Sequence, residues 1–221
     1  MQNWDIIARE WERFASGYLT TLTLFALSTL IAFAMALVLA NALFSRRTAL
    51  RGGARVFVDG MRMLPFLIYA YLLYYGLPSF GIRLDAWTAG VIALGTYHAA
   101  YIAEILRGAW AQLPAGQTES AKAMGHHGFG LFRRIVLPQL VLSSGPVLGN
   151  QLIYMLKDTA FLMIITVQEL TYAASSVQSM YFVPLEPFLV AILLYWSSTL
   201  LIERLIKFIQ TIAEKRGLGR S

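Results

Sequence analysis

The sequence predicts an all-α integral membrane protein with about five transmembrane helices and a cytoplasmic, partly helical loop between the third and fourth. Three observations support this fold class. Of the 221 residues, 57% are hydrophobic and only 14% are charged, which is too little charge to cover a water-facing surface. Several long runs contain no charged residue, and most basic residues fall between alternate runs.

Charge-free runs mark the expected membrane helices. The first, Phe14–Ser45, exceeds the roughly 20 residues that a helix needs to cross a bilayer. Because lipid offers no partner for backbone N–H and C=O groups, we expect each run to be helical. We expect one transmembrane domain over 1–221 with a membrane core at 15–212. The later runs are Met63–Ile82 (with its helix starting near Val56), Ala86–Ala103, Ile135–Leu156 and Pro187–Ile202, which continues as an amphipathic tail past Lys207.

Two stretches before the last run are ambiguous. Thr159–Gln168 is apolar but short, and Leu170–Leu185 is uncharged but rich in Ser, Thr and Gln. We expect a partly inserted or periplasmic-side excursion here, with a sixth crossing as the alternative.

The distribution of basic residues predicts the orientation, because short cytoplasmic loops are enriched in Lys and Arg. With five crossings, the N-terminus would lie outside and the C-terminus in the cytoplasm. The net charge of +6 then reflects topology, and no nucleic-acid partner is expected. Thirteen of the eighteen basic residues fall on one side: Arg46, Arg47, Arg51, Arg55, Arg107, Lys122, Arg133, Arg134, Arg204, Lys207, Lys215, Arg216 and Arg220.

The expected cytoplasmic loop, 109–138, has the pattern of a helix, a turn and a second helix. Good helix formers surround Glu119, Gly125 can adopt the positive φ of a helix C-terminus, and Pro138 begins or kinks the next helix. A short helix with small side chains suits insertion into a groove of another protein. From these features alone, an ordinary connecting loop is the favoured interpretation.

The spacing within this loop resembles the EAA motif of ABC importer permeases, which is E-A-A, three residues, G, nine residues, I-x-L-P. The chain has Glu119-Ser-Ala-Lys-Ala-Met-Gly125 and, nine residues later, Ile135-Val-Leu-Pro138, with Ser120 in place of the first Ala. The resemblance implies that this loop is a coupling helix that contacts a partner ATPase. The implied coupling residues are Glu119, Ser120, Ala121, Gly125, Ile135, Leu137 and Pro138.

Other segments are similar to the polar amino acid branch of these permeases. They are Arg62-Met-Leu-Pro65 with Tyr75-Gly-Leu-Pro78, Ala100–Gly108, Leu113–Gln117, Lys157-Asp-Thr-Ala160 and Val167-Gln-Glu-Leu170. The resemblance implies import of a polar amino acid or related opine across the bacterial inner membrane by alternating access. It also implies a second permease chain, cytoplasmic ATPases and an external solute-binding protein as partners. The chain departs from the branch pattern at Met63, Leu64, His98 and Ala160.

Ionisable residues within membrane segments are candidates for the transport path. Asp59 is expected to pair with Arg62, and Glu104 with Arg107 or Arg62. His98 either contacts the solute or packs as a hydrogen-bonded core residue, and Lys157 with Asp158 could form a gate. The candidate path or gate residues are Arg62, Pro65, His98, Tyr101, Glu104, Asn150, Lys157, Asp158 and Thr159.

The sequence contains no G-x-x-x-x-G-K-[ST] pattern, so we expect ATP and Mg to be bound by the partner and this chain to be no enzyme. No metal site is expected at the adjacent His126 and His127. The competing interpretations are an ion-coupled secondary transporter, which would favour an internal repeat, and a non-transporting scaffold subunit.

Overall fold

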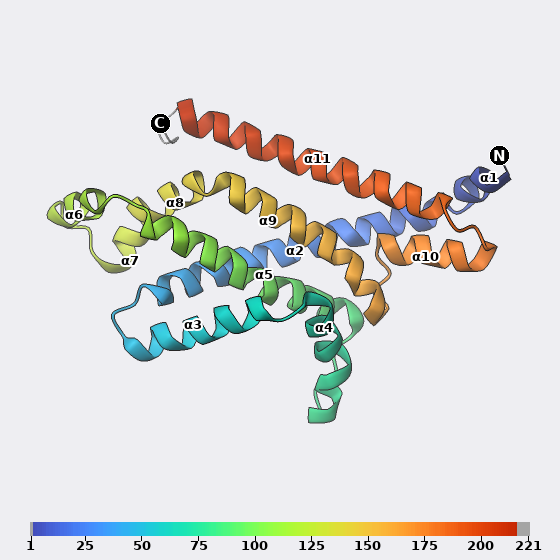
Figure 1. The fold of residues 1–221 in the computed structure, drawn as a ribbon, viewed down its shortest axis with the longest axis horizontal. Helices are drawn as coiled ribbons and strands as arrows, with labels where there is room; N and C mark the ends of the chain where they lie inside the picture. The colour runs from blue at the N-terminus through green and yellow to red at the C-terminus, as the bar shows by residue number, and fades with distance from the viewer. Residues whose placement is uncertain (1, 216–221) are drawn as a thin grey trace.

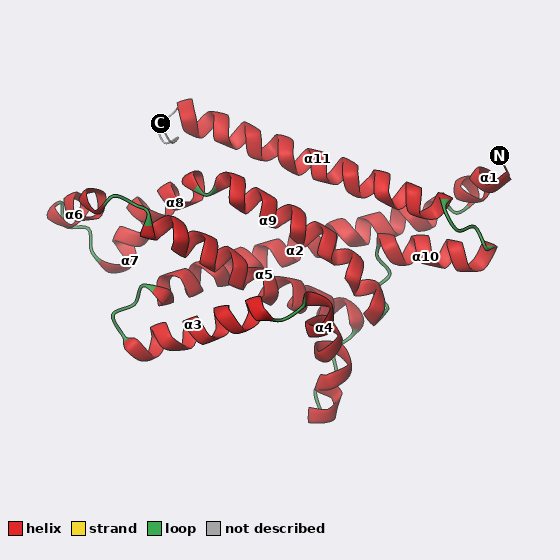
Figure 2. Ribbon diagram, in the orientation of Figure 1, coloured by secondary structure: helices red, strands yellow, loops and turns green. Residues whose placement is uncertain are grey.

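The computed structural model describes residues 2–215, and within them every regular element is helical. Figure 2 shows the helices joined by short loops. The elements are α1 (Gln2–Arg9), α2 (Trp11–Leu43), α3 (Thr48–Met63), α4 (Phe66–Tyr71), the π-helical η1 (Leu72–Gly76), the 3-10 segment η2 (Leu77–Phe80), α5 (Ala86–Ala111), α6 (Ala115–Ala123), α7 (Gly128–Leu131), the π-helical η3 (Phe132–Val136), α8 (Leu137–Ser143), α9 (Gly145–Asp158), the 3-10 segment η4 (Thr159–Ile165), α10 (Leu170–Tyr181) and α11 (Glu186–Lys215).

Three of these helices, α2, α5 and α11, are long and apolar enough to cross a membrane alone. Two bent pairs pass the same test together, so the described residues hold three to five candidate spans. The all-α membrane fold class is therefore confirmed, and the expected number of about five spans is reached when each bent pair counts as one.

The second span differs from the expectation of one continuous helix from near Val56 to Ile82. Instead α3 begins at Thr48 and ends at Met63, and the chain then bends by 106° into the segment Phe66–Phe80. Proline causes this break: Pro65 has no N–H to donate, and it holds Leu64 in extended backbone at φ −87° and ψ 139°. Figure 1 shows α4 projecting sideways from the bundle, whereas α3 runs along it.

The fourth span was also expected to be continuous over Ile135–Leu156, and it is interrupted at Ser144 between α8 and α9. Beyond α9 the chain bends by 48° into α10. The 12 residues of α10 measure about 18 Å at about 1.5 Å each, too short for the roughly 30 Å of a separate sixth crossing.

Small side chains let the helices of the bundle approach closely. A Cβ added at Gly95 of α5 would lie 2.8 Å from Cγ2 of Ile31 on α2, and one added at Gly149 of α9 would lie 2.9 Å from Cγ1 of Ile206 on α11. The buried face of α2, which packs on α5 and α10, repeats small residues about every four positions, namely Gly17, Thr21, Ser28, Ala32, Ala36 and Ala40.

The two ends of the bundle carry different elements. In Figure 1 the N-terminus and α10 lie at one end, whereas the start of α3, α6, α7 and the end of α11 lie at the other. The basic groups of the α2–α3 loop, the α6–η3 region and the end of α11 therefore share one end. Arg216 and Arg220 of the predicted basic set lie outside the described residues.

Candidate functional site

The loop between α5 and α8 folds as a helix, a turn and a short second helix, as expected. The backbone N–H of His126 donates to the carbonyl of Ala121 (3.0 Å), and the N–H of Gly125 donates to that of Lys122 (3.0 Å). Gly125 has φ +86°. These two bonds and the left-handed glycine form a Schellman motif, which satisfies the last carbonyls of α6. The first residues of the expected 109–138 stretch lie in the last turn of α5, which ends at Ala111.

The motif residues of this loop divide into exposed and supporting groups. Glu119, Ser120 and Gly125 are exposed, while Ala121 is buried toward the protein. Two large apolar side chains flank the turn in the open, since Met124 is 72% and Phe129 is 65% exposed. Such side chains beside a rigid turn form a surface suited to a protein partner.

The second half of the motif forms a wide turn. The N–H of Leu137 donates to the carbonyl of Phe132, five residues back, where a regular helix would use the residue four back. Pro138 explains this geometry, because its ring clashes with the carbonyl of residue i−4 in a regular helix. Ile135 and Leu137 are half-buried around this turn, and Pro138 lies in the first turn of α8.

His98 of α5 is buried at 1% exposure within the membrane region. Its Nδ1 lies 2.7 Å from Nε2 of Gln151 on α9, and its Nε2 lies 3.3 Å from Oδ2 of Asp158 at the end of α9. The second contact lacks hydrogen-bond geometry, so Nε2 has no hydrogen-bond partner among the described residues. The rings of Phe66, Tyr97 and Tyr101 surround the imidazole.

The other predicted path residues of this region have different surroundings. Asp158 is half-buried, and no Lys or Arg of residues 2–215 forms an ion pair with it. The exposed Lys157 places Nζ 6.0 Å from the Tyr154 ring centre. Thr159 is buried and donates to the Leu156 carbonyl (2.7 Å). Asn150 is exposed on α9, and its side chain makes no hydrogen bond within the described residues, so it is not part of this cluster.

A second charged group joins α3 to α5. Glu104 binds Arg107 in two contacts of 2.7 and 2.8 Å and lies 3.8 Å from Arg62 of α3. Both expected partners of Glu104 are thus found together. The expected pair of Asp59 with Arg62 is absent, because Asp59 faces Arg55 one helical turn earlier at 3.9 Å.

The bend at Pro65 is held by two tyrosines of α5. Tyr97 donates its hydroxyl to the carbonyl of Leu64 (3.0 Å), and Tyr101 donates to the carbonyl of Arg62 (3.3 Å). The break in α3 leaves carbonyls without helical partners, which is costly at membrane depth. Tyr101 therefore supports the bend, and Pro65 itself is exposed at the start of α4.

Sequence reasoning missed the contacts of Gln151, Glu169 and Tyr195. Gln151 contacts His98, and its spacing of seven from Asp158 on one helix could have revealed it. Glu169 is fully buried, accepts the N–H groups of Thr171 and Tyr172 (2.8 and 2.7 Å), and accepts the hydroxyl of Tyr195 (2.8 Å). It caps α10 and ties it to α11.

No group of three or more His, Cys, Asp and Glu residues within the described part could hold a metal ion.

Comparisons with known proteins agree with this architecture. Residues 28–211 match the family described as "Binding-protein-dependent transport system inner membrane component". The octopine transport system permease protein OccM of Rhizobium meliloti is 36% identical over 84% of this chain and 78% of its own length. The probable glutamine ABC transporter permease protein GlnM of Bacillus subtilis is 29% identical over 96% of this chain and 99% of its own length.

A solved structure shows the same fold. A chain in the crystal structure of an amino acid ABC transporter with histidines superposes with a TM-score of 0.84 at 31% identity. The match covers 93% of this chain and 96% of that one. Proteins of this family are permeases and not enzymes, and the ATPase of the transporter is a separate subunit. The chain therefore belongs to the binding-protein-dependent transport system inner membrane component family and is the membrane-spanning permease subunit of an ABC importer.

Proposed function

We propose that this chain forms part of the membrane pathway of an importer for a polar amino acid or an opine. The observation that supports this substrate class most strongly is the match along almost the whole chain to a solved amino acid ABC transporter. Relatives named for octopine and glutamine point to the same kind of solute.

The pathway requires a second permease chain, identical or paralogous. Arg62 and Asn150 are exposed on helices that contribute to candidate spans, and charged or amide groups are costly against lipid. A second permease would cover these groups or enclose water beside them. In this arrangement 15–212 is the membrane core of a single domain, and 109–138 is the coupling loop.

The α6–turn–α7 loop is the contact surface for the ATPase. It lies at the end of the bundle that carries the basic loops, and the positive-inside rule supports a cytoplasmic location for that end. The N-terminus and α10 then lie outside, where an external solute-binding protein would deliver the solute. Closure of two ATPases would move the paired loops together and reorient the path.

The solute contacts the cluster of His98 and Asp158 within the path. Among the residues that the structure describes, Nε2 of His98 has no hydrogen-bond partner and the Asp158 carboxylate has no cationic partner, so together they can bind a donor or charged group. Arg62 and Glu104 lie nearer the cytoplasmic end and form the inner gate.

Uptake assays test this proposal. The permease would be purified through an affinity tag with its partner subunits and reconstituted in vesicles with ATP and the binding protein. We expect ATP-dependent uptake of at least one of arginine, glutamine and octopine. Uptake that needs an ion gradient and no ATP, or uptake of none of them by an assembled complex, would refute the function.

Orientation is tested separately with single cysteines, because the chain has none. A cysteine at Ser79, in the exposed η2 segment, should react with an impermeant thiol reagent added outside whole cells. A cysteine at Thr48, the first residue of α3, should react only after the membrane is permeabilised. The reverse pattern would place the α6–α7 loop outside and remove the ATPase from it.

A further inference from the structure

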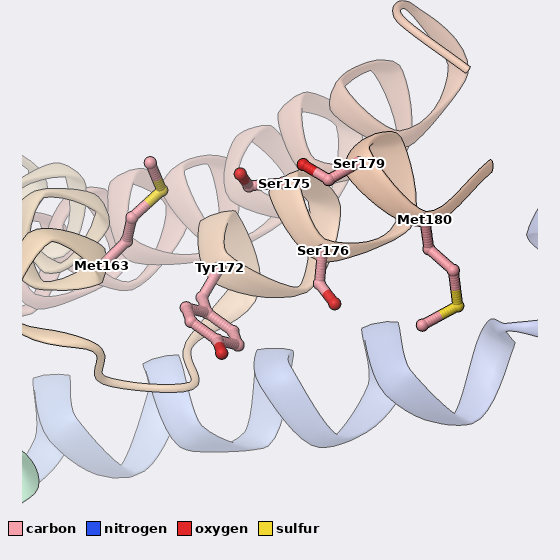
Figure 3. Close-up of a pocket in the computed structure, with 6 residues that line it drawn as sticks. All are labelled: Met163, Tyr172, Ser175, Ser176, Ser179 and Met180. Carbon is pink, nitrogen blue, oxygen red and sulfur yellow. The ribbon is translucent and has the colours of Figure 1, made fainter. Parts of the chain in front are cut away.

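One face of α10 forms a groove that the functions above do not use. The groove has a volume of about 520 Å³ and is lined by Met163, Tyr172, Ser175, Ser176, Ser179 and Met180. Figure 3 shows the two methionines at its ends with the tyrosine and the three serines between them. The opposite face of α10, with Leu170, Ala173, Ala174 and Val177, is buried in the bundle.

A fixed ion pair borders this groove. Arg13 of α2 donates from Nη1 to the Ser176 hydroxyl (2.9 Å) and from Nε to Oε2 of Glu10 (2.9 Å). Tyr181, one residue beyond Met180, donates to Oε1 of Glu10 (2.6 Å). The hydrogen bonds from Tyr181 and then Arg13 lower the pKa of Glu10 below its ordinary value, so its carboxylate stays charged at neutral pH.

The groups at the groove retain unused hydrogen-bonding capacity. A guanidinium has five N–H donors, and Arg13 uses two of them within the described residues. The hydroxyls of Tyr172 and Ser175 make no hydrogen bond in the described part of the chain. A tie between α2 and α10 through Arg13 and Glu10 does not use these hydroxyls or the cavity beside them, so they are available to a polar ligand.

We infer that this groove is an outer binding site for a zwitterionic α-amino acid, occupied before the solute reaches the membrane interior. The Arg13 guanidinium would bind the α-carboxylate in charge-assisted hydrogen bonds, and the Glu10 carboxylate would accept the α-ammonium group. Met163 and Met180 are flexible apolar residues that can accommodate different side chains.

The position of the groove supports an entry role, which rests on the proposed function and orientation. The groove lies on α10, at the end of the bundle opposite α6 and α7. Met163, at one end of the groove, follows Asp158 by five residues within the continuous α9–η4 segment. A solute leaving the groove past Met163 would therefore move toward the His98 and Asp158 cluster.

Protection of a single cysteine tests the site directly in the assembled, reconstituted transporter. Ser179→Cys places a thiol on the exposed part of the groove, and Ser79→Cys places one far from it on η2. The rate of reaction with an impermeant thiol reagent would be measured with L-arginine or L-glutamine. Agmatine and 4-aminobutanamide, the same molecules without the carboxylate, would serve as controls.

We expect the amino acids to protect the Ser179→Cys thiol and to leave the Ser79→Cys thiol unprotected. Ligand at about ten times its dissociation constant leaves roughly a tenth of the sites free, so the rate should fall about tenfold. Agmatine and 4-aminobutanamide should give little protection. Equal protection by the amines, or no protection in a complex that transports amino acids, would overturn the inference while leaving the proposed function intact.

Substitutions assign the protection to named groups. Arg13→Gln should abolish it, while Arg9→Gln, at an exposed arginine of the same end with no ion pair in the described residues, should retain it. Ser175→Ala breaks no internal hydrogen bond and should weaken protection about two- to tenfold. Protection that persists unchanged in both Arg13→Gln and Ser175→Ala would refute the site, even if one variant were poorly folded.

Discussion

The α6–turn–α7 loop and the cluster around His98 satisfy their polar groups in opposite ways. In the loop, backbone bonds over three to five residues close the end of α6, and the side chains of Met124 and Phe129 remain exposed. In the cluster, side chains that lie more than fifty positions apart bind one another, as with His98 and Gln151. The loop thus keeps its shape alone and presents a surface, whereas the interior exists only when α5 and α9 are packed together.

This difference separates two functions of the permease. A locally stabilised loop can move as one body when a partner pulls on it. An interior site built from two helices changes whenever those helices shift, which suits a site that must bind and then release its solute.

Breaking the loop should give the largest effect. Gly125→Val forces a β-branched residue into φ +86°, at a cost of about 1–2 kcal/mol, which lowers the docking-competent population roughly 5- to 30-fold. ATPase that co-purifies with the permease should fall accordingly. Gly130→Val, in the same loop at ordinary φ with open space around it, should remain near wild type. Equal losses in both variants would show that added bulk, not the turn, matters.

Within the interior, removing the Tyr97 hydroxyl should loosen the bend between α3 and α4. Tyr97→Phe leaves the Leu64 carbonyl without this donor and should destabilise the fold by about 0.6–1.7 kcal/mol, as measured by unfolding in detergent. Tyr71→Phe is the matched control, because Tyr71 is exposed and makes no hydrogen bond in the described residues. Equal stability of the two variants would mean that the bend does not depend on this hydroxyl.

Replacing His98 tests whether the cluster selects the solute. His98→Asn retains a donor and an acceptor, so the ranking of competing amino acids in uptake should change roughly 2- to 10-fold at constant protein level. His127→Asn, the same change on the exposed part of the α6–α7 loop, should leave the ranking unchanged. A uniform decrease for every solute, or loss of the protein from the membrane, would assign His98 a structural role instead.

The smallest effect is expected at the proposed inner gate. Arg62 is 38% exposed at its side chain and lies 3.8 Å from Glu104, so a double-mutant cycle of Arg62→Gln and Glu104→Gln should give a coupling energy of at most about 1 kcal/mol. The tighter Glu104–Arg107 pair should couple more strongly in the parallel cycle. The opposite order would show that the contact between helices governs this end of the path.

The same local-versus-distant contrast explains which features the sequence could predict. The turn at Gly125 and the start of α8 at Pro138 depend on neighbouring residues, so spacing alone was sufficient. Continuity of the second span was predicted wrongly, because a charge-free run says nothing about the backbone at Leu64 and Pro65.

Partners across helices were harder to predict. The pairing of Glu104 with Arg62 and Arg107 could be predicted from helical geometry. Helical geometry does not decide whether Asp59 pairs with Arg55 or with Arg62, because that depends on side-chain conformation. The contact of His98 with Gln151 requires the packing of α5 on α9, which a single sequence does not specify. The buried cap at Glu169 similarly requires Tyr195 from α11.

The wide turn at η3 sets how the loop is rotated about the axis of α8. A regular helix advances about 100° per residue, so the extra residue accommodated before Pro138 sets the angle at which α6 and α7 leave the axis of α8. Insertion or deletion of one residue within η3 would rotate the loop by about that amount and point its exposed side in a different direction. The number of residues between Gly125 and Pro138 therefore determines the direction in which the loop presents the surface that we propose for the ATPase.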